Sequence, residues 1–170
     1  FRSRLPSIEN VFKDEPIRRR KVSPEAYTHF LRGKMASLRG DVPRAIEEYK
    51  MALIHDDRSP YLETKLAREY IRAGRLDLAL KACQRALRID STFIDALLEE
   101  GRIYQAMEDF TQAREVYQRV LKLESRNEKA YLVLADLALK EGSLTEAEAL
   151  FRRMAKALPQ SFEASMGLGE

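Results

Sequence analysis

Small residues recur in this sequence at a fixed interval, and that interval limits what the chain can fold into more than any other feature. One set recurs every 34 residues: Ala45, Ala79, Ala113 and Ala147. A second set stands twelve residues before the first: Gly33, Ala67, Gly101 and Ala135. A period of this length with small residues at two fixed offsets indicates stacked pairs of helices, because only Gly or Ala lets helix backbones approach closely.

Local signals mark where these helices begin and end. Ser23 and Ser59 are each followed by proline, which suits a capping serine with proline at the first helical position. The pairs Ser125 with Glu128 and Ser143 with Glu146 have the spacing of capping boxes. Together these signals predict helices over 24–38, 42–55, 60–72, 76–89, 94–107, 110–123, 127–140 and 144–157.

The turns inside the expected helix pairs carry glycine in three of four cases. Gly40, Gly74 and Gly142 fall where a residue with positive φ is favoured. The third turn has Glu108 at this place, so we expect that turn to be tighter or more strained.

Four segments of the chain resemble the tetratricopeptide repeat (TPR) family: "HFLRGKMASLRGDVPRAIEEYKMAL", "TKLAREYIRAGRLDLALKACQRALRID", "LLEEGRIYQAMEDFTQAREVYQRVLKLES" and "YLVLADLALKEGSLTEAEALFRRMAKALP". The resemblance covers roughly residues 23–159 and implies an all-α, right-handed α-solenoid superhelix. We expect repeats at about 26–59, 60–93, 94–127 and 128–161, with a partial fifth repeat at 162–170. That fifth repeat stops inside its first helix, and the chain begins with Phe1 rather than Met, so we expect a fragment of a longer protein.

The basic excess of the chain lies in its first 22 residues. They hold seven basic and three acidic side chains, a net of +4, within a whole-chain net of +3 from 30 basic and 27 acidic residues. The charge of residues 23–170 therefore gives no support for nucleic-acid binding, and we expect no nucleic-acid partner. Membrane contact is expected at most through this extension, which contains the run "RRRK".

The extension can be read in two ways. Leu5, Ile8 and Phe12 have the i, i+3, i+7 spacing of a short amphipathic helix, which could dock over the groove described below. The alternative is a flexible linker, which is common for a terminal segment. No apolar run in the chain approaches the roughly 20 residues of a membrane span.

Candidate binding residues follow from the face of each first helix that lies away from its core stripe. In the family this face lines a concave groove that binds extended or helical peptides. In this chain the face carries apolar residues and a row of cations, which occupy the ninth position of three successive repeats. The row consists of Lys34, Arg68 and Arg102, and Lys65 and Arg72 lie close to it. The candidate groove residues are Tyr27, Phe30, Lys34, Tyr61, Lys65, Arg68, Arg72, Leu98, Arg102 and Leu132.

Two properties of this face support binding, and each has an alternative explanation. A row of cations can hold carboxylates, and arginine can do so bidentately; a charged, solvated face would look the same. Exposed apolar residues indicate a binding surface, unless the N-terminal extension covers them. Leu31, Leu38 and Leu139 extend the expected exposed apolar set.

The clamp by which some family members grip chaperone C-termini is not present. It requires Lys, Asn, Asn, Lys and Arg at five fixed positions. This sequence has Phe30, Lys34, Lys65, Asp95 and Glu99 there. The resemblance therefore implies groove binding but not this ligand.

Nothing in the sequence points to catalysis, and we expect no cofactor or metal. His29 and His55 lack the spacing of metal ligands and are expected to be half-buried structural residues. Cys83 takes the place filled by aromatic residues in other repeats, so it is expected to be a core thiol. No phosphate-binding loop or nucleophile motif occurs.

The sequence thus predicts a non-catalytic scaffold or adaptor that binds a partner peptide or helix, with acidic residues, in the concave groove. One alternative is self-association into an oligomeric scaffold, because solenoid ends associate unless capped. Another is the adaptor domain of a larger enzyme or of a secretion or envelope complex. The compact repeats and short loops resemble bacterial proteins of the cell envelope, and localisation stays open between cytoplasm and envelope.

Overall fold

The computed structural model describes residues 23–161 and Met166, so the predictions made for residues 1–22 and for most of the partial fifth repeat lie outside the described residues. The described part contains eight helices in sequence: α2 (Pro24–Leu38), α3 (Val42–His55), α4 (Pro60–Arg72), α5 (Leu76–Ile89), α6 (Ile94–Ala106), α7 (Phe110–Leu123), α8 (Glu128–Lys140) and α9 (Leu144–Ala157). The predicted helix positions are confirmed, each to within one residue at either end.

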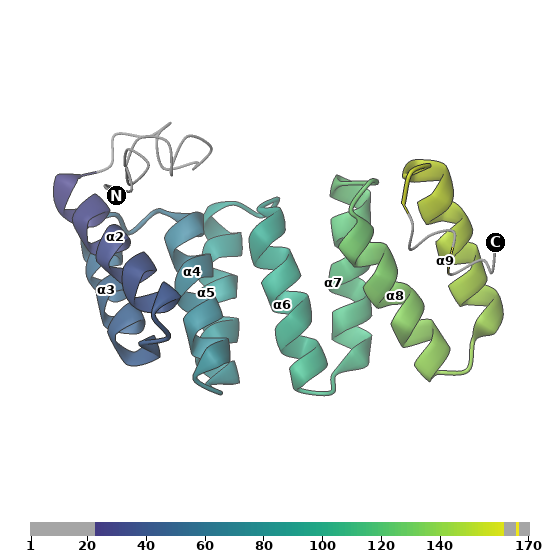
Figure 1. Ribbon diagram of the computed structural model, residues 1–170, viewed down its shortest axis with the longest axis horizontal. Coiled ribbons are helices and arrows are strands. Elements are labelled where there is room, and N and C mark those ends of the chain that lie inside the picture. The colour runs from purple at the N-terminus through teal and green to yellow at the C-terminus, as the bar shows by residue number, and fades with distance from the viewer. Residues whose placement is uncertain (1–22, 162–165, 167–170) are drawn as a thin grey trace, which may run out of the picture.

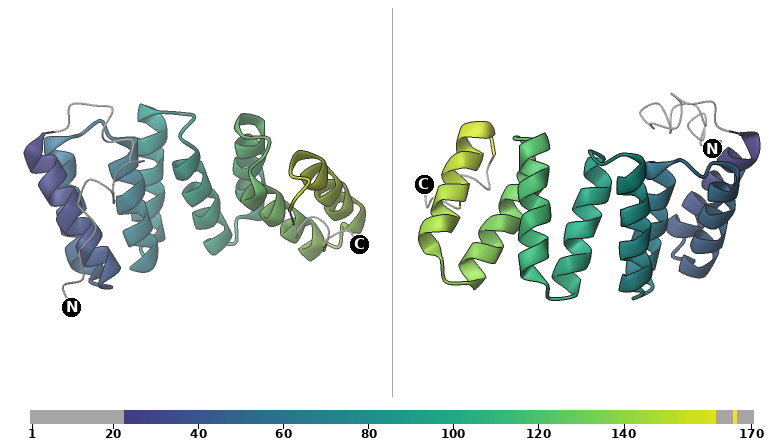
Figure 2. Two further views of the ribbon diagram at one scale, coloured as in Figure 1. Left: turned by 45° about the horizontal axis from the view of Figure 1, so that its top comes forward. Right: turned by 180° about the vertical axis from the view of Figure 1, so that it is seen from behind.

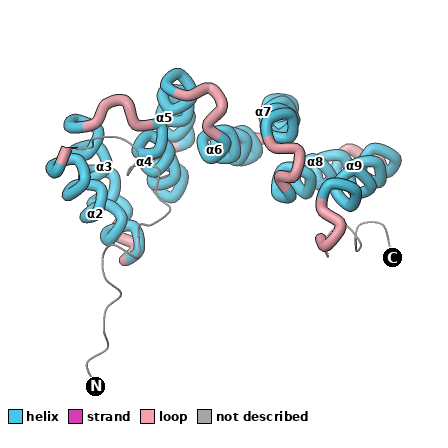
Figure 3. The backbone as a smooth tube through the Cα atoms, turned by 90° about the horizontal axis from the view of Figure 1, so that it is seen from above, coloured by secondary structure: helices cyan, strands magenta, loops and turns pink. Residues whose placement is uncertain are grey.

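The helices form a single row of antiparallel pairs in chain order, with α2 and α9 at its opposite ends (Figures 1 and 2). The row is arched, and α2, α4, α6 and α8 lie along the inside of the arch (Figure 3). Each helix packs against the next one along the chain, and α4 also contacts α6. This is the right-handed α-solenoid that the 34-residue period predicts.

The small residues lie where the two helices of a pair touch. A Cβ added to Gly33 would lie 2.8 Å from the ring of Tyr49, and one added to Gly101 would lie 2.7 Å from the ring of Tyr117. The alanines of the second set are buried as well. The periodic small residues therefore set the close approach of the helices, as the sequence predicts.

The turns and caps agree with the sequence in most places. Gly40, Gly74 and Gly142 have φ values of 78°, 70° and 76°, and Glu108 has a φ of 60° at the equivalent place. A non-glycine residue in this left-handed region is strained, which confirms the expectation for the third turn. The backbone N–H groups of Ala26 and Leu62 donate to the capping hydroxyls of Ser23 and Ser59.

The two predicted capping boxes are wrong. The N-cap of α8 is Asn127, whose Oδ1 accepts a hydrogen bond from the N–H of Ala130 at 3.1 Å. Ser125 stands two residues too early to reach the first turn. Ser143 is the N-cap residue of α9, but its side chain makes no capping hydrogen bond.

Buried apolar residues form two clusters rather than one. The first joins α2, α3, α4 and α5 with Ile103, and the second runs from Leu97 to Met154. Between them α6 carries two buried carboxyl groups, Glu99 and Glu100. No helix within the described residues is long and apolar enough to span a membrane.

Candidate functional site

Five of the ten candidate residues come together at the N-terminal end of the arch, on α2 and α4. We call this group the aromatic–lysine cluster: Tyr27, Phe30, Lys34, Tyr61 and Lys65. The Phe30 ring centroid lies 6.3 Å from that of Tyr27 and 5.7 Å from that of Tyr61. The Nζ atoms of Lys34 and Lys65 lie 6.0 Å and 4.6 Å from the Phe30 and Tyr61 ring centroids. These are cation–π distances, so both ammonium groups are held against aromatic faces.

Two of these residues are not exposed, which corrects the sequence-based expectation. Phe30 is 1% exposed and Tyr61 is 7% exposed. Phe30 also packs on Tyr49 of α3, with ring centroids 6.3 Å apart, because it is long enough to fill the space between neighbouring helices. The two rings therefore form a buried floor under the lysines rather than an open contact surface.

The remaining apolar candidates are more accessible. Tyr27, Leu98 and Leu132 are half-buried, and so is Leu31. Leu38 and Leu139 are exposed, as the sequence predicts. The inner side of the arch therefore offers partly accessible apolar surface on α2, α6 and α8.

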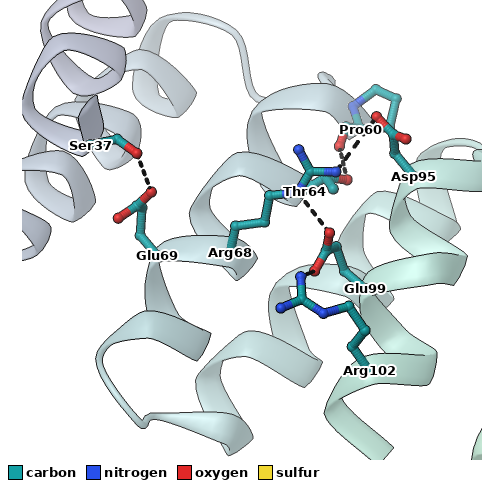
Figure 4. Close-up of polar contacts among 8 residues, drawn as sticks. All are labelled: Ser37, Pro60, Thr64, Arg68, Glu69, Asp95, Glu99 and Arg102. Atoms are coloured by element: carbon teal, nitrogen blue, oxygen red, sulfur yellow. Dashed lines mark hydrogen bonds and ion pairs between the residues drawn. The ribbon is translucent and has the colours of Figure 1, made fainter. Parts of the chain in front are cut away.

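A second group of polar residues lies at the centre of the arch, and we call it the Glu99 cluster: Arg68, Glu99 and Arg102. Arg68 Nε donates to Glu99 Oε1 at 2.8 Å, and Arg102 Nη1 donates to Glu99 Oε2 at 2.7 Å (Figure 4). The Glu99 side chain is only 3% exposed. A buried carboxylate between two arginines is stabilised by both charge-assisted hydrogen bonds.

Arg72, which was predicted as a neighbour of the row, also pairs with a buried glutamate. Arg72 Nη1 donates to Glu69 Oε2 at 3.0 Å and to the backbone oxygen of Ser37 at 3.1 Å. The Ser37 hydroxyl donates to the other oxygen of Glu69 at 2.6 Å (Figure 4). This network links α2 to α4, just as Glu99 links α4 to α6.

The cations of the predicted row therefore do not share one kind of partner. Lys34 belongs to the aromatic–lysine cluster, whereas Arg68 and Arg102 converge on Glu99. At the next repeat Asp136 pairs with Lys140 at 2.8 Å. The sequence reasoning missed the buried glutamates that orient the arginines. The signal that could have found them is a glutamate at the sixth position of one repeat, following an arginine at the ninth position of the preceding one.

The two histidines and the cysteine that were considered for catalysis contact residues of the repeat framework. His29 Nδ1 lies 2.8 Å from Glu48 Oε2, and the His29 ring stacks on that of His55 at 5.9 Å. His29 is half-buried as expected, whereas His55 is exposed. Cys83 is fully buried, and burial raises the pKa of its thiol well above the ordinary value. No group of three potential metal-ligating side chains occurs in the part of the chain that the structure describes.

Family models described as tetratricopeptide repeat match residues 98–170 and residues 70–124, which together exceed half of the chain. Tetratricopeptide repeat protein 12 of Mus musculus is 30% identical over 116 residues, 68% of this chain and 16% of that protein. The Hsp70-Hsp90 organizing protein of Triticum aestivum is 25% identical over 87 residues, 51% of this chain and 15% of that protein. The chain thus spans less than a quarter of the length of these curated relatives.

Solved structures show the same architecture. A MamA crystal structure superposes with a TM-score of 0.74 at 22% identity, covering 89% of this chain and 85% of that one, which is a likeness of fold. The first TPR of Spaghetti (RPAP3), bound to the HSP90 peptide SRMEEVD, superposes with a TM-score of 0.67 at 26% identity. That match covers 71% of this chain and 96% of the solved chain.

Proposed function

Because the chain belongs to the tetratricopeptide repeat family, we propose that it is a non-catalytic scaffold whose inner face binds an acidic peptide or helix of a partner protein. The observation that carries this proposal is the charge of the inner face. Seven basic residues occupy the groove positions of the first helices: Lys34, Lys65, Arg68, Arg72, Arg102, Lys129 and Lys140. Four acidic residues share them: Glu69, Asp95, Glu99 and Asp136. The excess of three positive charges favours an acidic partner.

Half-buried apolar residues lie on the same face and would supply contact area. Tyr27, Leu98 and Leu132 are distributed over α2, α6 and α8, so a bound segment that touches all three would span most of the arch. Apolar contacts supply affinity while the charges select the partner and set its register.

The relatives support a peptide ligand in general but not one particular sequence. The RPAP3 domain was solved with the HSP90 peptide SRMEEVD, in which three of the last four residues are acidic. The present chain has Phe30, Lys34, Lys65, Asp95 and Glu99 at the five positions where the chaperone clamp needs other residues, and Phe30 and Glu99 are buried. We therefore expect SRMEEVD to bind this chain weakly or not at all.

A direct test is selection of short random peptides by display on this chain, followed by mapping of the bound peptide through amide chemical shifts. We expect selected peptides to be rich in Asp and Glu and to shift residues of α2, α4, α6 and α8. Shifts confined to α3, α5, α7 and α9 would contradict the proposal, as would selection without acidic enrichment.

Variants that replace lysine by uncharged glutamine make this test specific to the inner face. Replacement of Lys34 and Lys65 by Gln should weaken the selected peptides about tenfold at low salt. Replacement of Lys50 and Lys81 by Gln on α3 and α5 removes the same charge from the outer side of the arch, so it should leave affinity unchanged. Reversal of Arg68 and Arg102 to Glu is unsuitable, because it would place two further carboxylates beside the buried Glu99 side chain.

Self-association is the alternative function, and exposed apolar residues near the turns within the helix pairs favour it. Leu38 is 81% exposed, and Leu144 is 69% exposed. Static light scattering across a range of concentrations decides between the two. A mass that rises with concentration in the parent, and not after Leu38→Ser and Leu144→Ser replacement, would support self-association.

A further inference from the structure

The Glu99 cluster differs from the other buried glutamates in its ratio of charges. Glu69 pairs with one arginine, Arg72, and Glu63 pairs with one arginine, Arg85, through two hydrogen bonds of 2.7 Å and 2.8 Å. Glu99 receives two arginines. The first two networks are one-to-one and neutral, whereas Arg68, Glu99 and Arg102 together carry a net charge of +1, which only the peripheral ion pair of Arg68 with Asp95 offsets.

The surrounding acidic residues offset this charge only weakly. Asp95 is the nearest, with its Oδ2 atom 3.9 Å from Arg68 Nη2, which is beyond hydrogen-bond distance. Its side chain is 48% exposed, so the remaining attraction is screened by solvent. Asp136, one repeat further, is paired with Lys140.

Both arginine side chains remain partly accessible to solvent, whereas the glutamate between them does not. The Glu99 side chain is 3% exposed, while the Arg68 and Arg102 side chains are 35% and 47% exposed. Arg68 donates to Glu99 through Nε and Arg102 through Nη1, and a guanidinium has five N–H donors. Among the described residues, neither arginine donates a further hydrogen bond. The buried glutamate thus holds two guanidinium groups from adjacent repeats in fixed orientation, with donors left over.

We propose that Arg68 and Arg102 bind one carboxylate of the partner segment at the centre of the groove, with Glu99 as the residue that positions them. This rests on the proposed function and narrows it to a single acidic side chain or chain end read by α4 and α6. A carboxylate fits because guanidinium pairs with it through two parallel hydrogen bonds, and because it neutralises the cluster. Donors that are already oriented lose little entropy on binding.

Acetate is the probe that tests this site in the whole chain. The arginine Nε–Hε resonances are followed in NMR spectra during titration with sodium acetate, against sodium chloride at the same ionic strength. We expect saturable shifts at Arg68 and Arg102, with a dissociation constant about fivefold lower than at Arg72 and Arg85, the one-to-one pairs. Equal responses at all four arginines, or none at Arg68 and Arg102, would overturn the proposal.

A variant that restores a one-to-one pair gives the second readout. Arg102→Gln leaves Arg68 alone with Glu99, so the response of Arg68 to acetate should fall to that of Arg72. Lys81→Gln removes the same charge from α5, outside the groove, and should leave the response at Arg68 unchanged. An undiminished response at Arg68 in Arg102→Gln refutes the shared site. If that variant does not fold, the comparison of four arginines in the parent still decides.

Peptide binding by the inner face and carboxylate binding by Arg68 and Arg102 can be refuted independently. If selected acidic peptides bind the inner face but acetate does not distinguish the Glu99 cluster, only the assignment of the carboxylate to Arg68 and Arg102 is wrong. If acetate binds the cluster but no peptide binds the inner face, the proposed function is wrong.

Discussion

Replacement of Glu100 by leucine should stabilise the protein, because this carboxyl group occupies a place built for an apolar side chain. Glu100 lies one period from Leu66 and Leu134, which are each 2% exposed in the core. Glu100 itself is 9% exposed, and within the described residues it makes no hydrogen bond or ion pair. Burial raises the pKa of Glu100, and the charge of Arg119 offsets this only in part.

Two contributions set the expected magnitude. Burial of a polar group without a hydrogen-bond partner costs about 1–3 kcal/mol in proteins, and leucine removes that cost. Full burial of a leucine side chain contributes about 1.5–3 kcal/mol. Leucine is not the same shape as glutamate, so part of the gain is lost to imperfect packing. We therefore expect the free energy of unfolding at pH 7 to rise by about 2 kcal/mol.

The pH dependence gives this prediction a sign that packing alone would not produce. A carboxyl group whose pKa is raised in the folded state destabilises the fold as pH rises above its unfolded value, near 4.3. The advantage of Glu100→Leu over the parent should therefore be smallest near pH 4 and grow toward pH 7. Urea unfolding followed by circular dichroism at several pH values measures it, with Glu100→Gln as the uncharged control of similar shape. A constant difference across this range would show that the carboxyl is not desolvated, and a loss of stability would refute the packing argument.

Three further predictions concern stability and reactivity. Gly101→Ala should lower the free energy of unfolding by about 1–2 kcal/mol, because the added Cβ would lie 2.7 Å from the fully buried Tyr117 ring. This cost should outweigh the better helix propensity of alanine. An unchanged thermal melt would mean that the ring moves aside. Glu108→Gly should raise the free energy of unfolding by about 0.5–1 kcal/mol, since glycine adopts a φ of 60° without strain; a decrease in urea unfolding would indicate a stabilising contact of the Glu108 side chain. Cys83 should resist iodoacetamide in the native protein and react on unfolding, because its thiol is buried with a raised pKa; rapid native labelling would contradict this.

The positions of the helices could be predicted because each depends on short-range chemistry that repeats. Proline after a capping serine fixes the starts of α2 and α4, and glycine with positive φ fixes the turns after α2, α4 and α8. The one unusual turn, at Glu108, was visible as the missing glycine. Capping was less predictable where two polar residues compete, since Asn127 lies two residues nearer to α8 than Ser125.

The exposure of the candidate site could not be predicted in the same manner. A helical period identifies the face that a residue lies on, but not how far the neighbouring helix stands from it. Phe30 and Tyr61 lie on the groove face, yet their rings meet between α2 and α4 and become buried. Arg68 and Glu99 are distant in sequence and become partners only through stacking of α4 on α6, so the glutamate that orients the arginines emerges only from the three-dimensional arrangement.

The contact between Arg68 and Glu99 joins the ninth position of one repeat to the sixth position of the next, and this makes the order of the repeats matter. If residues 60–93 were deleted in frame, Lys34 would take the position of Arg68 beside Glu99, and a cation would still pair with the carboxylate. If residues 94–127 were deleted instead, Arg68 would face Val133. Shortening of this array is therefore not neutral with respect to which module is lost. A gene that drops its second repeat would keep the charge pairing at the new junction, whereas one that drops its third would not.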